Sequence, residues 1–368
     1  MNMAASIDTD FPPFPVGTPR SALTHQLTSP PEPVARRIRL AYPSRINAMA
    51  LDSSKIVPSQ GSYLAGELLI TCDLMREAEV EIVPDGPAVQ TAPDCAHPVL
   101  ARHAALLMRD ALGIRERLRV RVTAPDLPAH LGLGSSSGQL AAVASAVNEL
   151  YGSPAAPRQL IKFLARNHGE EIDGDEQHLL PVQCLGGSAT AGLIPGAVQV
   201  IAGAQVPLLK ADLPADLHLV LGMPHQPLIW DARASLAAEA RHFDAFAVTG
   251  RAHGPEIAYR LLHDAWPALE DGDLRPLGQL LFDYRFRMGS LANCAFSHPD
   301  LLATGAKIEH IFTDRLADIL TLSSVGPTFA ALTCTPETCE QAFTAAGLRA
   351  LRCRPWNRGY TLTSQEAL

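Results

Sequence analysis

A glycine- and serine-rich segment, Pro128-Ala-His-Leu-Gly-Leu-Gly-Ser-Ser-Ser-Gly138, has the composition of a phosphate-binding loop. It follows an alternating strand pattern at 118–122 and precedes a helical pattern at 139–151. Glycines let the backbone approach an anion, N–H groups at the helix N-terminus donate to it, and serine hydroxyls can reach Mg²⁺. The segment lacks the lysine and spacing of a Walker A motif, and an ordinary tight turn with a serine N-cap is the alternative. It predicts binding of a nucleotide or a phosphorylated substrate.

The composition excludes several classes of protein. The 368 residues, 47% of them hydrophobic and 18% charged, suffice for two lobes or one large domain. A net charge of -8 without a Lys/Arg block argues against a nucleic-acid partner, and no apolar run is long enough to span a membrane. The scattered cysteines include no CxxC pair, which indicates a cytoplasmic protein with reduced thiols and no structural zinc. Cys184 is interpreted as a buried hydrophobe.

The elements that must position this loop alternate between strands and helices. Residues 1–34 are rich in proline and predict an extended or disordered arm. A polar acidic stretch covers 169–178. Periodicity predicts strands at 37–42, 79–83, 197–201, 217–221, 319–322, 328–333, 350–353 and 359–362, and helices at 97–112, 157–168, 231–247, 256–271, 275–291, 299–314 and 337–346. This order indicates an α+β protein.

Three motifs together resemble the GHMP superfamily of galactokinase, homoserine, mevalonate and phosphomevalonate kinases. Pro43-Ser-Arg-Ile-Asn47 resembles the first motif, 128–138 the second, and Ser323-Ser-Val-Gly-Pro-Thr-Phe-Ala330 the third, in the family's order over residues 43–333. The resemblance implies an α+β, GHMP-type two-lobe fold, with a ribosomal protein S5 domain 2-like N-terminal half and a ferredoxin-like C-terminal half. It implies an arm at 1–34, a nucleotide-binding domain at 35–225 and a C-terminal domain at 226–368.

The same resemblance implies an ATP- and Mg-dependent kinase that phosphorylates a hydroxyl of a small metabolite. The second motif would hold ATP, and residues of the first and third motifs would lie near the substrate. The implied nucleotide contacts are Gly132, Leu133, Gly134, Ser135, Ser136, Ser137 and Gly138; the implied substrate contacts are Arg45, Asn47, Asp52, Ser324 and Gly326; the implied Mg ligands are Ser136 and Glu170.

The catalytic carboxylate is sought in the acidic stretch before the Gly186-Gly187 pair. Relatives place an Asp a few residues before such a pair, so Asp175 is the first choice and Asp173 the second. The stretch lacks the family's Asp-Asn sequence, and a solvated acidic loop is the alternative.

A non-kinase branch is similar as well. Beta-ribofuranosylaminobenzene 5'-phosphate synthase resembles this chain in Pro43-Ser-Arg45, in His130 to Ser135 with Gln139-Leu-Ala141, and in 323–328, but it differs at Ser136-Ser-Gly138. That resemblance implies transfer of a phosphoribosyl group from phosphoribosyl pyrophosphate to an aromatic acid, with magnesium but without ATP. A binding protein that has lost turnover is a third hypothesis. The acceptor is left open, as is the choice between a monomer and a homodimer.

Overall fold

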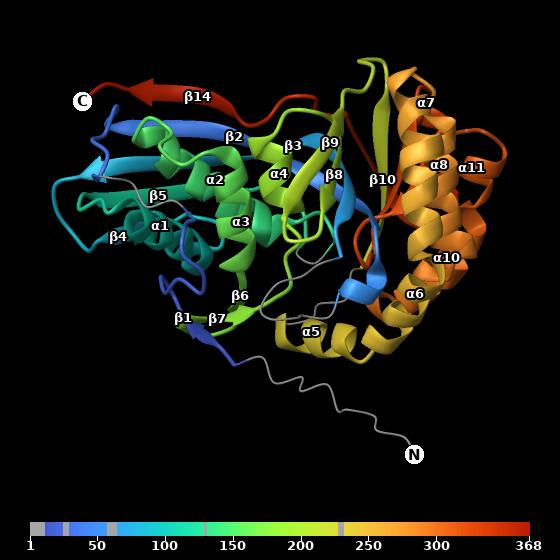
Figure 1. Cartoon of the computed structure of the whole chain (residues 1–368), viewed down its shortest axis with the longest axis horizontal. Coiled ribbons are helices and arrows are strands. Elements are labelled where there is room, and N and C mark those ends of the chain that lie inside the picture. Colours follow the sequence, from blue (N-terminus) through green and yellow to red (C-terminus); the bar gives the residue numbers. More distant parts are fainter. Residues whose placement is uncertain (1–11, 25–28, 57–64, 129–130, 227–231) are drawn as a thin grey trace.

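The computed structural model describes residues 12–24, 29–56, 65–128, 131–226 and 232–368. Its first sheet has seven strands, in the order β14-β2-β3-β5-β4, with β8 on β3 and β9 on β8. Figure 1 shows this sheet in the N-terminal part of the molecule, with the C-terminal strand β14 alongside β2. The strands are β2 (Arg37–Ala50), β3 (Glu67–Val83), β4 (Val89–Thr91), β5 (Arg117–Thr123), β8 (Val198–Ala202), β9 (Val206–Ala211) and β14 (Thr361–Glu366).

Four helices pack on one face of the first sheet and enclose the N-terminal core. They are α1 (Pro98–Leu112), α2 (Ser135–Leu150), α3 (Pro157–Arg166) and α4 (Gly187–Leu193). α2 is buried along most of its length because alanine and valine fill its middle turns. The small side chains let α2 lie close to β2 and β3, and this packing fixes where its N-terminus points.

The second sheet is four-stranded and antiparallel, in the order β11-β12-β10-β13. Helices pack against it on the C-terminal side of the molecule. Its strands are β10 (His218–Pro224), β11 (Ile319–Leu322), β12 (Phe329–Thr333) and β13 (Leu348–Cys353); the helices are α5 (Ala232–Ala240), α6 (Phe243–Arg260), α7 (Trp266–Glu270), α8 (Arg275–Phe282), α9 (Ser290–Asn293), α10 (Leu301–Ile308), α11 (His310–Thr313) and α12 (Pro336–Ala345).

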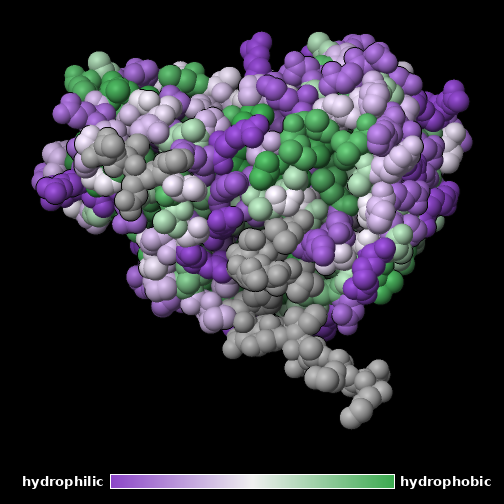
Figure 2. Space-filling model, in the orientation of Figure 1, coloured by the Kyte–Doolittle hydropathy of each residue, from purple (hydrophilic) through white to green (hydrophobic). Residues whose placement is uncertain are grey.

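The two sheets do not divide the chain at 225/226. β10 precedes that boundary but pairs with β12 and β13, and β14 follows it but pairs with β2. Figure 2 shows apolar side chains gathering between the two halves near β9 and β10, whereas the outer helical faces are mainly polar. No helix among the described residues is long and apolar enough to cross a membrane.

The arm predicted to be extended or disordered makes contacts with the rest of the N-terminal half in residues 12–24 and 29–34. The short strand β1 (Phe14–Pro15) pairs with β7 (Asp175–Pro181), which also pairs with β6 (Gly169–Ile172). The Gly17 N–H donates to Nδ1 of His103 at 2.9 Å, and the Arg20 N–H donates to Oδ1 of Asn167 at 2.6 Å. The backbone of this proline-rich segment is therefore held by side chains of α1 and of the residue after α3 and forms little regular secondary structure. Residues 1–11 and 25–28 lie outside the described residues.

Most of the remaining predicted elements are found with shifted ends, but the helix predicted at 231–247 is divided between α5 and α6, and two further predictions need correction. The predicted break between helices at 248–255 is instead the middle of α6. A Cβ on Gly250 would lie 2.0 Å from the Ser54 nitrogen, so this glycine permits close packing and does not end the helix. The acidic stretch at 169–178 belongs to the β6–β7 hairpin.

Candidate active site

The second motif forms a tight loop that ends at the N-terminus of α2. Gly132 and Gly134 have φ values of +79° and +67°, a left-handed backbone that favours glycine. Gly134 is the N-cap and provides no side-chain hydrogen bond, and the first intrahelical bond runs from the Gly138 N–H to the Gly134 carbonyl. The N–H groups of 135–137 therefore have no intrahelical acceptor. Together with the helix dipole they make an anion-binding terminus.

Side chains from β2, β3 and the third motif hold this loop by its carbonyl oxygens. Nη1 of Arg45 and Oγ of Ser323 donate to the Gly132 carbonyl at 3.0 and 2.7 Å. Nη1 of Arg76 donates to the Gly134 carbonyl at 3.3 Å. The loop thus turns its carbonyls toward protein donors and leaves its N–H groups for an anion.

The first and third motifs meet beside the loop. The Ser324 N–H donates to the Asn47 carbonyl at 2.7 Å, with Ser324 itself at φ +56°. The β2–β3 register shifts on both sides of 44–47, which marks β-bulges flanking the first motif. Between the shifts, Ile46 packs in the core, whereas Arg45 and Asn47 face a cavity.

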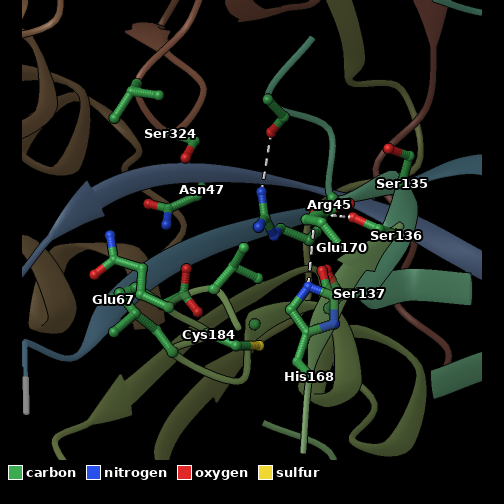
Figure 3. Close-up of a pocket in the computed structure, with 18 of the residues that line it drawn as sticks. Arg45, Asn47, Glu67, Ser135, Ser136, Ser137, His168, Glu170, Cys184 and Ser324 are labelled. Carbon is green, nitrogen blue, oxygen red and sulfur yellow. Dashed lines mark hydrogen bonds and ion pairs between the residues drawn. The ribbon is translucent and has the colours of Figure 1, made fainter. Parts of the chain in front are cut away.

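This cavity has a volume of about 210 Å³ and lies where the three motifs converge. Figure 3 shows the Ser135–Ser137 turn and Glu170 on one side of Arg45, with Asn47, Glu67 and Ser324 on the other side. The cavity is therefore polar at both ends, and the Arg45 guanidinium lies between them. Its lining residues are Arg45, Asn47, Glu67, Gly132, Gly134, Ser135, Ser136, Ser137, His168, Glu170, Val182, Gln183, Cys184, Leu185, Gly187, Ser188, Ser235, Leu236, Glu239, Ser324, Val325 and Gly326.

The predicted magnesium ligands lie together at the α2 end. The Ser136 hydroxyl donates to Oε1 of Glu170, and Nε2 of His168 lies 3.7 Å from the same oxygen. Among the described residues no group of three or more His, Cys, Asp or Glu side chains could hold a metal on its own. A serine and one carboxylate fit Mg²⁺, which takes few protein oxygens and completes its shell with phosphates and water.

The other ionisable groups of the cavity are shifted by burial. Glu67 is only 1% exposed, and burial raises the pKa of its carboxyl above the usual range, opposed by Arg45, the Gly187 N–H and Asn47. Burial raises the pKa of Glu239 to about 7, although Gln183 donates to its Oε1 at 2.9 Å. Burial also raises the pKa of Cys184 to about 12, so this thiol stays protonated at neutral pH.

The predicted catalytic carboxylates, Asp175 and Asp173, do not line this cavity. Both lie at the turn of the β6–β7 hairpin, beside Gly174 at φ +77°. Oδ1 of Asp175 accepts hydrogen bonds from the N–H groups of Gln177 and His178 at 2.8 and 3.0 Å. Its carboxylate stabilises the start of β7, and the hairpin carries Glu170, rather than either aspartate, into the cavity.

Three other predicted site residues, Asp52, Leu133 and Gly138, also lie outside the main cavity and contribute to the surrounding structure. Asp52 caps a short 3-10 helix at Ser53–Lys55, and its Oδ1 accepts hydrogen bonds from both the N–H and the hydroxyl of Ser54. Leu133 is buried and lines a smaller neighbouring cavity of about 70 Å³. Gly138 lies within α2 against Arg76. The predicted residues that do line the main cavity are Arg45, Asn47, Gly132, Gly134, Ser135, Ser136, Ser137, Glu170, Ser324 and Gly326.

Sequence reasoning missed Glu67, His168 and Glu239 as cavity residues. Glu67 carried a usable signal, because it is a lone charge at the head of the apolar run Leu-Leu-Ile. Glu239 had none, since its helix shows no clear apolar face. Gly187 was noted only as part of the Gly186-Gly187 pair. Ser188, which follows it, shares a 2.7 Å hydrogen bond between its Oγ and that of Ser137.

Comparison with known proteins agrees with this architecture. Residues 99–187 match the family model described as the GHMP kinases N terminal domain. Comparison with curated proteins found no similar sequence. The matched segment contains nearly all of α1, the second motif and the Gly186-Gly187 pair.

Solved structures extend the similarity to most of the chain. A homoserine kinase from Cytophaga hutchinsonii is 14% identical with a TM-score of 0.59, over 90% of this chain and 98% of that one. A mevalonate diphosphate decarboxylase from Staphylococcus aureus is 14% identical with a TM-score of 0.60, over 89% and 98%. A structure of MDDEF in complex with MVAPP, AMPPCP and magnesium is 14% identical with a TM-score of 0.58, over 89% and 100%. At this identity they establish the α+β GHMP-type fold.

Proposed function

We propose that this chain, with its GHMP-type N-terminal domain and fold, is an ATP- and magnesium-dependent kinase that phosphorylates a hydroxyl of a small metabolite. The observation that carries the proposal is the α2 N-terminus, which opens into the cavity beside the Ser136–Glu170 pair. Free N–H groups and an oxygen pair suited to Mg²⁺ are the two components that binding of a nucleoside triphosphate requires.

Each end of the cavity has a separate task in this proposal. The N–H groups of 135–137 would bind phosphate oxygens, and Ser136 and Glu170 would hold the magnesium ion, which neutralises charge on the phosphates. Arg45 lies between the two ends and would stabilise the negative charge of the group in transfer. Asn47 and Ser324 face the opposite end, where the acceptor would bind. Phosphoryl transfer needs little beyond this positioning and charge neutralisation.

One observation favours a second candidate, transfer of a phosphoribosyl group to an aromatic acid. Neither aspartate of the hairpin lines the cavity. Phosphoribosyl transfer, which releases pyrophosphate and carbon dioxide, needs magnesium and anion donors but no base that deprotonates an acceptor hydroxyl. A protein that binds nucleotide without turnover is compatible with the same observation. ATP consumption, carbon dioxide release and binding without either reaction separate these three functions.

The test combines ligand binding with turnover. Thermal shifts with ATP, ADP and phosphoribosyl pyrophosphate, each with Mg²⁺, identify the donor, because a ligand that binds the native state raises the melting temperature. ADP formation is then measured over a panel of small alcohols that begins with homoserine, the substrate in the name of one structural neighbour. Stabilisation by phosphoribosyl pyrophosphate alone would favour the second candidate.

Ser136→Ala gives a variant test of the magnesium site. We expect a higher Mg²⁺ requirement and at least a tenfold loss of turnover, about 1.4 kcal/mol, because one of two protein oxygens is removed. Ser145→Ala is the matched control, since it makes the same change in the same helix at a buried hydroxyl outside the cavity. An unchanged Mg²⁺ requirement in Ser136→Ala would contradict the proposed site.

A further inference from the structure

Glu67 is a buried carboxylate at the end of the cavity away from the α2 turn. It begins β3, opposite Ala50 of β2 and Ile201 of β8. Alternation along the strand places Leu68 and Ile70 in the core between the sheets, whereas Glu67 shares its face with Leu69, which packs against Ala191 of α4. This face of β3 is apolar next to Glu67, so the position would suit a leucine, yet it holds a carboxylate.

The surroundings of Glu67 leave part of its carboxylate unused. A Cβ on Gly187 would lie 2.4 Å from Oε1, so the absence of a side chain there lets the carboxylate rest against the start of α4. Oε2 is buried and has no hydrogen-bond partner within the described part of the chain. A buried carboxylate with an unsatisfied oxygen costs free energy, and such groups concentrate at functional sites.

The charged and titratable groups that face Glu67 define its electrostatics. Arg45 comes from β2 and Cys184 from the segment before α4, while His168, Glu170 and Glu239 line the remaining walls. Burial has the largest effect on the Glu67 carboxyl and raises its pKa, which Arg45 opposes. The carboxylate is therefore a stronger proton acceptor than one in water.

We propose that Glu67 is the catalytic base of the reaction and accepts the proton of the acceptor hydroxyl at Oε2. This inference rests on the proposed kinase function. As the acceptor oxygen bonds to the γ-phosphorus, its proton passes to Oε2 and the bond from that phosphorus to the β–γ bridging oxygen breaks. The electron pair of that bond leaves with ADP. Arg45 lies between Glu67 and the α2 turn, where the transferred group would pass.

The experiment compares Glu67→Gln with Glu239→Gln in the full chain. Both make the same charge-removing change in the same cavity, but Oε1 of Glu239 already accepts from Gln183. We expect Glu67→Gln to lower kcat by about a hundredfold or more, with MgATP stabilisation retained. Its kcat should also lose the fall at low pH that the wild type shows when Glu67 becomes protonated. Glu239→Gln should lose far less.

A thermal readout separates a catalytic from a structural role without knowledge of the acceptor. Because the pKa of Glu67 is raised in the folded state, protonated Glu67 stabilises the fold relative to the charged form. This stabilisation is lost as pH rises through the folded-state pKa. Glu67→Gln should therefore gain melting temperature relative to the wild type as pH rises. A structural ion pair with Arg45 predicts the reverse, a lower melting temperature at neutral pH.

The outcomes divide cleanly. Wild-type protein that binds no MgATP, or never forms ADP with any alcohol tested, refutes the proposed function itself. A wild type that turns over while Glu67→Gln keeps its kcat, or while Glu239→Gln loses as much, refutes the role of Glu67 alone. If Glu67→Gln folds poorly, Glu67→Asp retains the charge, and recovery of the acid limb of the pH profile in that variant is required.

Discussion

Replacing Gly138 with alanine tests how the protein holds the N-terminus of α2. A Cβ at this position would lie 1.3 Å from Nη1 of Arg76, so the guanidinium has to move. Arg76 is 3% exposed, and its Nη2 donates to Oγ of Ser44 at 3.0 Å while Nη1 donates to the Gly134 carbonyl. Burial lowers the pKa of Arg76 to about 10, and no carboxylate pairs with it in the described residues.

The sign of the change in stability on Gly138→Ala shows which of two contributions is larger, the gain in helix propensity or the loss of the Arg76 hydrogen bonds. Helix propensity alone predicts that Gly138→Ala stabilises the protein by about 1 kcal/mol. Displacing the guanidinium forfeits two hydrogen bonds from a charged donor, each worth about 1.5 kcal/mol or more, so the loss is about 3 kcal/mol. The net expectation is destabilisation by about 2 kcal/mol. MgATP should also bind more weakly, because the Gly134 carbonyl loses the Arg76 donor that holds the loop.

The assay is urea unfolding of a double-mutant cycle with Arg76→Ala. In the Arg76→Ala background nothing charged obstructs the new methyl group, so Gly138→Ala should stabilise that protein by up to about 1 kcal/mol. Comparison within one background removes the separate cost of truncating Arg76. The reasoning is refuted if Gly138→Ala stabilises the wild type, or if it destabilises both backgrounds equally.

Two further predictions follow from groups outside the cavity. Asp175→Asn should leave kcat close to the wild-type value in the ADP assay, because the half-buried carboxylate serves the hairpin and does not line the cavity; a hundredfold loss would restore it as the base. Burial lowers the pKa of His103 to about 4. The unfolded chain therefore binds the extra proton between pH 6.5 and 4, and stability should fall by up to about 1.4 kcal/mol per pH unit as pH decreases. His103→Gln, which can also accept from Gly17 and donate to Asn167, should remove this slope in melts at pH 7 and 5; an unchanged slope would contradict it.

The part of the site that the sequence predicts is the part made by local backbone geometry. Gly132 and Gly134 indicate a loop with left-handed backbone, and the helical pattern that follows predicts free N–H groups where the loop meets the start of the helix. Arg45 and Asn47 could be placed beside it only because the first motif resembles a known family. Their physical reason, two bulges flanking 44–47, depends on pairing with β3 and is not visible in the sequence.

The predicted catalytic aspartates, Asp173 and Asp175, lie away from the cavity because distance along the chain is a poor guide across a hairpin. Asp175 is closer than Glu170 to the Gly186-Gly187 pair in sequence, yet the β6–β7 register pairs Glu170 with Leu180 and brings Glu170 into the cavity. The turn then carries Asp173 and Asp175 away. An Asp-Gly-Asp sequence between two short runs is also a strong turn signal, and this reading competes with the catalytic one.

Glu67 shows what kind of signal remains useful when motifs are incomplete. A carboxylate at the head of the apolar start of β3 contradicts the pattern around it, and Arg45 of β2 offsets only part of the effect of its burial. In the proposed function, its position opposite the α2 turn explains why the fold would tolerate the cost, because the negative charge would lie beyond Arg45 from phosphates bound at that turn. This separation would reduce the repulsion between Glu67 and those phosphates at the place where the proposed reaction needs a proton acceptor. Glu67 and the loop motif thus lie at the two ends of one cavity, and Arg45, which donates to the loop at the Gly132 carbonyl, lies between them.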